Sequence, residues 1–338
     1  PSAMAYINRL FGPEERMRPL SVWSFVTAGG PVVGVVAGAP LVDSLGWRFI
    51  FWVQAPMCVL AFLIALWLLP PTDRVEGVRF DVWGSATLGI GAASLLAGIS
   101  QGRAWGWTSV ATLGCFAISA VALTTFVRVE QRALAPLLVL SWFRTRNIVF
   151  PVLSQMLTNF AYMGGFVLVP QLLGERGLGL EKGTVGLLVI ARPLAFSIIA
   201  PLAALVTVRV GERVAGVVGA LGVVTSMVLW SQVGVGSAYA FIITASAFSG
   251  IGLGIASPAL TSLMSSAVDE KDMGVAGAMQ QLMTQLGAVM GSAVLVTVSV
   301  TASEGNVGPF HTAFLVGAVV AGVGALVALR VQPMLRRD

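Results

Sequence analysis

The sequence predicts an all-α polytopic membrane protein, and three observations support this fold class. Of the 338 residues, 57% are hydrophobic and only 10% are charged, whereas a water-soluble domain carries roughly 25% charged residues. The mean hydropathy is +0.89. Apolar runs of about twenty residues recur between short polar breaks, and a helix of this length crosses the hydrocarbon core of a bilayer.

Ten runs are long enough to span the membrane, which predicts a bundle of about ten helices. In chain order the expected spans are Leu20–Val42, Phe49–Leu69, Val82–Ser100, Ser109–Val127, Ile148–Val169, Thr184–Val206, Val214–Trp230, Ala238–Ser257, Val275–Val300 and Thr312–Leu329. If the segment before Leu20 is cytoplasmic, fifteen of the 20 Lys and Arg residues lie in inner segments and four in outer loops. This asymmetry fits the positive-inside rule and predicts a cytoplasmic C-terminus.

The first span contains small residues that predict close packing against another helix. Three glycines recur at every fourth position and form one side-chain-free face on a helix: Gly30, Gly34 and Gly38. Pro31 removes a helix hydrogen bond within the same run, so we expect a bend there. After a short polar break, Trp47 and Arg48 open an aromatic cluster that is typical of an anchor at the membrane surface.

These residues resemble motifs of a known family. Gly30-Pro31 with Gly34, then Trp47-Arg48-Phe49-Ile50-Phe51 and Ala55-Pro56, resemble the antiporter motif and the following signature of the major facilitator superfamily. The subfamily is that of the fourteen-span drug:proton antiporters of the EmrB/QacA type. Val35 replaces a glycine that the family usually has, whereas the helix-facing Gly34 is kept.

The resemblance implies a major facilitator fold that lacks roughly its first four spans, so the chain is expected to be truncated at its N-terminus. The ten spans would then be spans five to fourteen. The implied organisation is the end of span four and a cytoplasmic loop (1–19), two helices of the N-terminal bundle (20–69), an inserted helical hairpin with a basic loop (70–147), a C-terminal six-helix bundle (148–331) and a cytoplasmic tail (332–338).

Polar residues within the later spans are the candidates for a substrate cavity. Gln155 and Asn159 lie one turn apart on a polar stripe that also includes Tyr162. In lipid such groups must face protein or water, so they either form interhelical hydrogen bonds or line a cavity. Arg192 is the one charge inside a predicted span, and Gln281 and Gln285 share one face of a later span.

A turn between two spans resembles the family's second cytoplasmic motif, G-x-x-x-D-R-x-G-x-R. Arg209, Gly211 and Arg213 match this motif. Ala204 and Val208 stand where the motif has Gly and Asp. The resemblance therefore implies that the turn is kept and that the charge relay of the motif is not.

The residues do not indicate an enzyme, a metal centre or nucleic-acid binding. No cluster of His, Cys, Asp and Glu has metal-ligand spacing, and no basic run is interleaved with stacking aromatics. Gly250, Gly252 and Gly254 follow no strand, so they predict helix packing and not a dinucleotide site. All fifteen acidic residues fall in loops or at span ends. The resemblance to the antiporter family implies that the acid that carries the proton lies upstream of Pro1.

Composition and polar stripes predict a bundle suited to alternating access around a central site. The resemblance implies that the full-length parent exports lipophilic drugs, antibiotics or secondary metabolites in exchange for protons. It implies a monomer in the plasma (inner) membrane, powered by the proton gradient without a cofactor. Two alternatives stay open: a non-transporting receptor or accessory protein, and a facilitator for another class of small molecule.

Overall fold

The computed structural model describes residues 44–69, 81–132, 144–174, 176–268, 273–300 and 306–332, together with Trp142 and five helical positions of the first predicted span: Val26, Gly30, Gly34, Gly38 and Leu41. Within these residues nine helices are long and apolar enough to cross a membrane. They are α3 (Trp47–Leu68), α4 (Val82–Trp105), α5 (Val110–Glu130), α6 (Arg146–Leu173), α7 (Lys182–Val210), α8 (Glu212–Trp230), α9 (Tyr239–Ser266), α10 (Met273–Ser299) and α11 (Gly308–Leu329).

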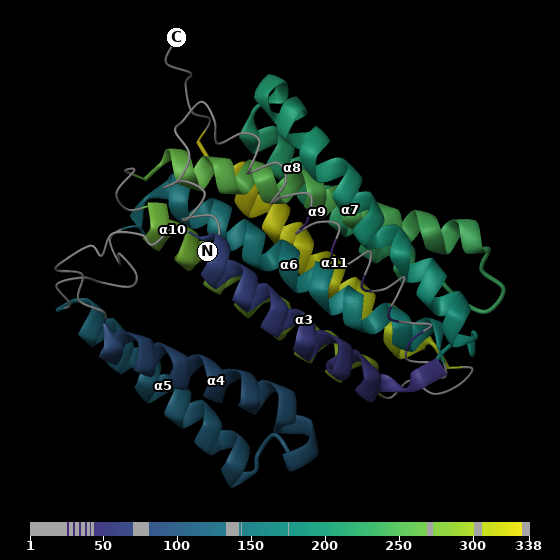
Figure 1. The fold of residues 1–338 in the computed structure, drawn as a ribbon, viewed down its shortest axis with the longest axis horizontal. Coiled ribbons are helices and arrows are strands. Elements are labelled where there is room, and N and C mark those ends of the chain that lie inside the picture. The colour runs from purple at the N-terminus through teal and green to yellow at the C-terminus, as the bar shows by residue number, and fades with distance from the viewer. Residues whose placement is uncertain are drawn as a thin grey trace.

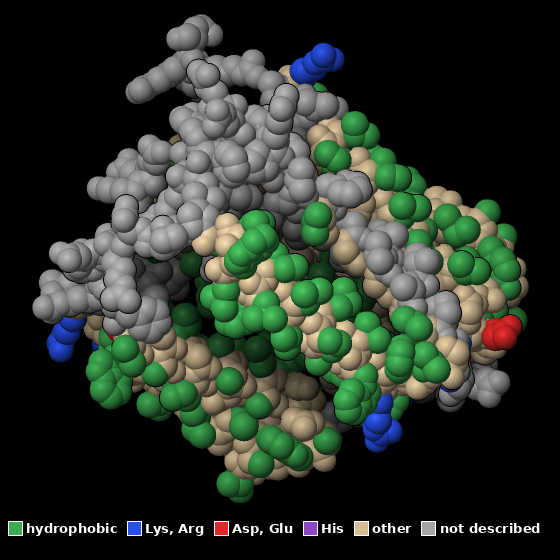
Figure 2. Space-filling view, in the orientation of Figure 1, with side chains coloured by type: hydrophobic (Ala, Val, Ile, Leu, Met, Phe, Trp, Pro, Cys, Tyr) green, Lys and Arg blue, Asp and Glu red, His purple; other side chains and the backbone are tan. Residues whose placement is uncertain are grey.

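The nine helices confirm the predicted all-α membrane fold. Most of them run further than the apolar run that predicted them; α9, for example, ends at Ser266 and not at Ser257. Apolar side chains cover most of the visible face of these helices (Figure 2), as contact with lipid requires.

Helices α6 to α11 pack into one bundle (Figure 1). Helix α9 lies between α7 and α8, while α6 contacts both α10 and α11, and α11 also contacts α8. The main core contains aromatic side chains from several of these helices. Among them, the ring of Trp230 on α8 stacks on Phe314 of α11, with centroids 5.8 Å apart and planes 25° from parallel.

Glycines allow neighbouring helices of this bundle to approach closely. A methyl group on Gly252 of α9 would lie 2.6 Å from the carbonyl oxygen of Gly219 and 2.6 Å from the amide nitrogen of Val223, both on α8. Likewise, a methyl group on Gly287 or Gly291 of α10 would clash with backbone carbonyl groups of α6. The glycine run of α9 is therefore a packing surface, as the sequence analysis expected.

Helices α4 and α5 form a hairpin that is set off from the bundle in Figure 1. The Asp81 carboxylate caps α4 by accepting a 2.7 Å hydrogen bond from the amide of Gly84. Leu88 and Phe126, from one end of the hairpin, pack in an apolar cluster with Ile148 of α6 and residues of α9 and α10. This end of the hairpin is thus attached to the six-helix bundle.

Helix α3 has no buried residue in the part of the chain that the structure describes. Near its start the Arg48 guanidinium lies 4.5 Å above the Trp47 ring, and Trp47 packs edge-on against Phe51 with centroids 6.1 Å apart. These contacts suit the predicted interfacial anchor. A methyl group on Gly34 would meet nothing within 4 Å, as is also true of Gly30 and Gly38, so the predicted packing of this face stays a prediction. Pro31 lies outside the described residues.

We predict that Gly252→Ala destabilises the protein. The methyl group would meet backbone atoms of α8 that cannot move aside, so α8 and α9 must separate, at a cost of about 1–3 kcal/mol or more. Thermal unfolding in detergent should show a melting temperature lowered by several degrees. The matched control is Gly322→Ala on α11, where a methyl group would meet nothing within 4 Å. Equal melting temperatures for the two variants would contradict the close approach of α8 and α9.

Candidate functional site

A network of polar side chains joins α6, α9 and α10 inside the bundle. The amide nitrogen of Gln155 on α6 donates to the hydroxyl of Ser257 on α9 at 3.1 Å. The amide nitrogen of Gln280 on α10 donates to the hydroxyl of Thr261 at 2.6 Å, and lies 3.3 Å from the amide oxygen of Gln155. We call these four residues the glutamine network. Its members from α9 and α10 are only half-buried.

The position of the glutamine network follows from the helix contacts around it. Gly287 and Gly291 bring α10 against the backbone of α6. Gln280 is seven residues, or about two turns, before Gly287 and therefore lies on the same face of α10. On α6, Asn159 is one turn beyond Gln155 and donates its side-chain amide to the Gln155 carbonyl at 3.1 Å. Polar residues of α6 therefore meet those of α10 on the inside of the bundle.

Arg192 of α7 is enclosed by α6. Its side chain is only 2% exposed, and Nη1 donates to the carbonyl of Tyr162 at 3.0 Å. The guanidinium carbon lies 5.0 Å from the centroid of the Tyr162 ring and 6.0 Å from that of Phe166. Nη2 is buried without a hydrogen-bond partner among the described residues. The missing side chain at Gly165 leaves room for it, since a methyl group there would lie 3.2 Å away.

This environment shows what surrounds the Arg192 charge within the described chain. The guanidinium does not reach an aqueous cavity, and no carboxylate of the described chain pairs with it. Instead a carbonyl and two aromatic faces stabilise the charge; a desolvated cation over an aromatic ring gains about 2 kcal/mol. A role of Arg192 in a substrate cavity stays a prediction.

The other predicted residues fall into two groups. Three of them are buried on the inner side of α6: Gln155, Asn159 and Tyr162. The side chain of Gln155 donates a hydrogen bond to Ser257, and that of Asn159 donates one to the backbone carbonyl of Gln155. Gln281 and Gln285 lie on an exposed face of α10. The sequence analysis therefore missed Gln280. The spacing between Gln280 and the packing glycine Gly287 is the signal that distinguishes it from Gln281.

The turn between α7 and α8 contains the predicted motif remnant. Gly211 has φ +86°, a left-handed conformation that favours glycine, and it starts α8 directly after α7 ends. Arg209 is exposed at the end of α7, and Arg213 occupies the first turn of α8. Gly211 thus places two arginines at the same end of the bundle.

Acidic residues of the described chain lie only at the ends of helices: Asp81, Glu130, Glu181 and Glu212. No group of three or more His, Cys, Asp and Glu side chains suited to a metal ion occurs among the described residues. The chemistry that the described interior offers is therefore hydrogen bonding by amides and hydroxyls, together with one enclosed cation.

Comparison with known proteins shows which family of proteins this chain resembles. The Major Facilitator Superfamily model matches residues 1–292 and, in a second match, residues 146–337. The chain therefore belongs to the major facilitator superfamily. The second match begins at Arg146, where α6 starts.

Three relatives illustrate the similarity. The Multidrug resistance protein Stp of Mycobacterium tuberculosis is 27% identical over 300 residues, which cover 87% of this chain and 55% of that protein. The Tetracenomycin C resistance and export protein of Streptomyces glaucescens is 30% identical, with the same coverage of 87% and 55%. The Multidrug transporter protein MdtP of Bacillus subtilis is 24% identical, with coverage of 90% and 56%. The chain spans about half the length of the curated relatives it matches.

We predict that Gln280→Leu lowers the melting temperature by a few degrees while Gln281→Leu leaves it unchanged. The first variant leaves Gln155 and Thr261 without a hydrogen-bond partner on α10, and an interhelical hydrogen bond in a membrane contributes about 0.6 kcal/mol and up to about 1.7. Gln281 is the matched control because it is the same residue type, one position on, with an exposed side chain. Equal shifts in thermal unfolding would show that the glutamine network does not hold α10 in place.

Proposed function

We propose that this chain contributes the C-terminal half of an exporter of lipophilic small molecules that is driven by proton antiport. The observation that carries the proposal is the set of polar side chains inside an otherwise apolar bundle: Gln155, Asn159, Ser257, Thr261, Gln280 and Arg192. Polar and charged groups inside a membrane bundle are costly, and they mark pathways for substrates and ions.

The glutamine network suits a bundle that changes conformation. It joins three helices through single hydrogen bonds, each of which contributes less than about 2 kcal/mol in a membrane. Such bonds can be exchanged as helices shift, whereas a buried ion pair would lock them. Its half-buried members also leave amide and hydroxyl groups within reach of a bound molecule. A ligand with much apolar surface and a few polar groups is the class that fits.

The relatives support this substrate class, since several are named as multidrug resistance or export proteins. Export at the expense of a proton gradient also requires a group that binds and releases a proton within the membrane. The described acids lie at helix ends, and the chain covers 55% of the length of two of these relatives. We therefore propose that the proton-carrying acid belongs to a part of the exporter outside this chain.

We propose that Arg192 couples export of the substrate to binding and release of the proton. Its guanidinium stays charged in a membrane, and Nη2 is enclosed without an acceptor among the described residues. An acid from elsewhere in the exporter could pair with this group when ionised and release it when protonated. The exporter is proposed to be a monomer in the plasma membrane, with the end that holds Arg209 and Arg213 and with the C-terminus in the cytoplasm. No cofactor is required for this cycle.

We predict that the full-length parent lowers the accumulation of a lipophilic cationic dye in cells whose own exporters are deleted, and that a protonophore abolishes this effect. The 338-residue chain alone should show no gradient-driven efflux. Dye fluorescence and membrane expression would be measured together. Efflux by the short chain would contradict the proposed position of the acid. A well-expressed parent that moves no dye would favour a receptor or a facilitator of another substrate class.

We predict that Arg192→Met and Arg192→Lys lower efflux by the parent at least tenfold without loss of expression. Methionine removes the charge, and lysine cannot donate in the planar geometry of a guanidinium. No carboxylate of the described residues pairs with Arg192, so Arg192→Met leaves no buried charge without a partner there, and its melting temperature should stay within a few degrees. The control is Arg176→Met, since the exposed Arg176 lies in a loop and donates a hydrogen bond to Gln171. Normal efflux in both Arg192 variants would leave this arginine a purely structural role.

A further inference from the structure

A groove with an apolar floor and one cation opens at the end of the bundle where α7 meets α8. Its volume is about 500 Å³. It is lined by the end of α7, the first turns of α8, and single residues of α9 and α11: Val210, Gly211, Glu212, Arg213, Val214, Val217, Val218, Leu263 and Leu329. The glutamine network and Arg192 do not line it, so the groove is separate from the proposed transport pathway.

The rim and the floor of the groove differ in exposure. Leu263 is buried at the floor, whereas Val214, Val218 and Leu329 are about half exposed at the rim. In a membrane-spanning bundle these exposed apolar side chains face lipid. The groove therefore opens sideways to the bilayer and accepts a molecule from it.

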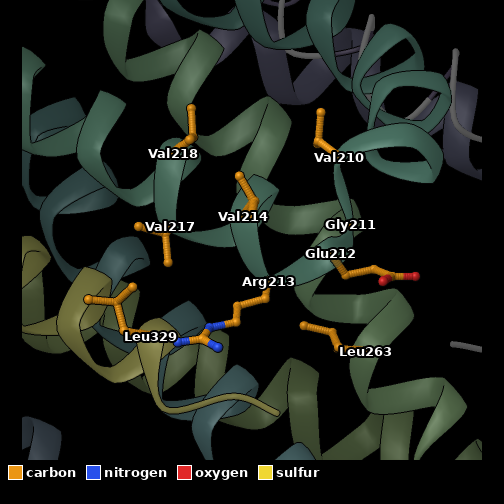
Figure 3. Close-up of a pocket in the computed structure, with 9 residues that line it drawn as sticks. All are labelled: Val210, Gly211, Glu212, Arg213, Val214, Val217, Val218, Leu263 and Leu329. Carbon is orange, nitrogen blue, oxygen red and sulfur yellow. The ribbon is translucent and has the colours of Figure 1, made fainter. Parts of the chain in front are cut away.

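Arg213 supplies the one positive charge of this groove. Figure 3 shows its side chain running toward Leu329, while the carboxylate of Glu212 points away in the opposite direction. No hydrogen-bond or salt-bridge partner of the Arg213 guanidinium occurs in the described part of the chain. Five N–H donors in a planar fork are thus free to bind an anion such as a phosphate group.

The depth of Arg213 in the membrane matches that of a phospholipid phosphate. Helix α8 has 19 residues, so it is about 28 Å long and barely crosses a hydrocarbon core of about 30 Å. Arg213, the second residue of α8, must lie at the membrane surface. From there Val214, Val217 and Val218 continue along the helix toward the membrane interior.

We infer that this groove binds one anionic phospholipid, with its phosphate on Arg213 and an acyl chain along the valines of α8. Charge complementarity favours an anionic headgroup, and the apolar floor favours a lipid over a free anion. Basic pockets between transmembrane helices are known to select headgroups in this way. A lipid there would fill the space between α8 and α11 and hold the ends of α7, α8, α9 and α11 together.

Native mass spectrometry of the purified chain tests the site, using phosphatidylglycerol and phosphatidylcholine with identical acyl chains. We expect the chain to retain phosphatidylglycerol more strongly, and Arg213→Gln to reduce this preference about fivefold, the factor that one surface arginine contributes toward anionic lipid. The matched control is Arg209→Gln, which removes the same charge four residues earlier, at the exposed end of α7 and outside the groove, and should reduce the preference clearly less than Arg213→Gln does. Equal losses in both variants would mean that only net charge matters, and would overturn the site.

Two further variants keep the test decisive if Arg213→Gln folds poorly. Arg213→Lys keeps the charge and should retain most of the preference for phosphatidylglycerol. Val217→Trp fills the groove without a change of charge and should reduce retention of both lipids. If Val217→Trp retains lipid normally while millimolar inorganic phosphate displaces it, Arg213 binds free anions and the lipid site is wrong. Displacement by the exported dye would instead make the groove a substrate entrance and would equally overturn it.

Discussion

Close contact between helix backbones at glycines is the constraint on which this structure depends. Lipid tails are as apolar as leucine, so burial of apolar side chains gives helices no reason to associate within a bilayer. Association then relies on van der Waals contact, and glycine permits the shortest distances. Gly252 brings α9 against α8, and Gly287 with Gly291 brings α10 against α6. The glutamine network lies between helices that these contacts position.

The polar interior is a consequence of that close packing. With α10 against α6, Gln280 lies near enough to Gln155 to share hydrogen bonds, although the two residues are 125 positions apart in the chain. Arg192 is enclosed in a similar way, because Gly165 leaves room for its guanidinium beside α6. Small residues therefore both bring the helices together and make space for the few polar side chains that the interior holds.

Arg192 and Arg213 have opposite environments. Arg192 is covered by aromatic rings and held by a backbone carbonyl, so its charge acts only within the protein. Arg213 lies at the end of α8, beside a groove that opens to lipid, and its charge acts on the surroundings of the protein. One cation therefore lies within the bundle interior and the other at the end of the bundle where α7 meets α8.

Hydropathy and spacing along the sequence determined the class of fold, the location of the nine spans that the structure describes, the packing role of the α9 glycines and the position of Arg192 inside a span. These are local properties, since each depends on twenty or so consecutive residues and on helix periodicity. The choice of Gln280 over Gln281 was decided only by the tertiary structure, because neighbouring residues point about 100° apart on a helix and only contact with α6 shows which direction is inward. The partner of Arg192 and the groove at Arg213 depend likewise on helices that are distant in the chain, so their positions follow from packing and from no local pattern.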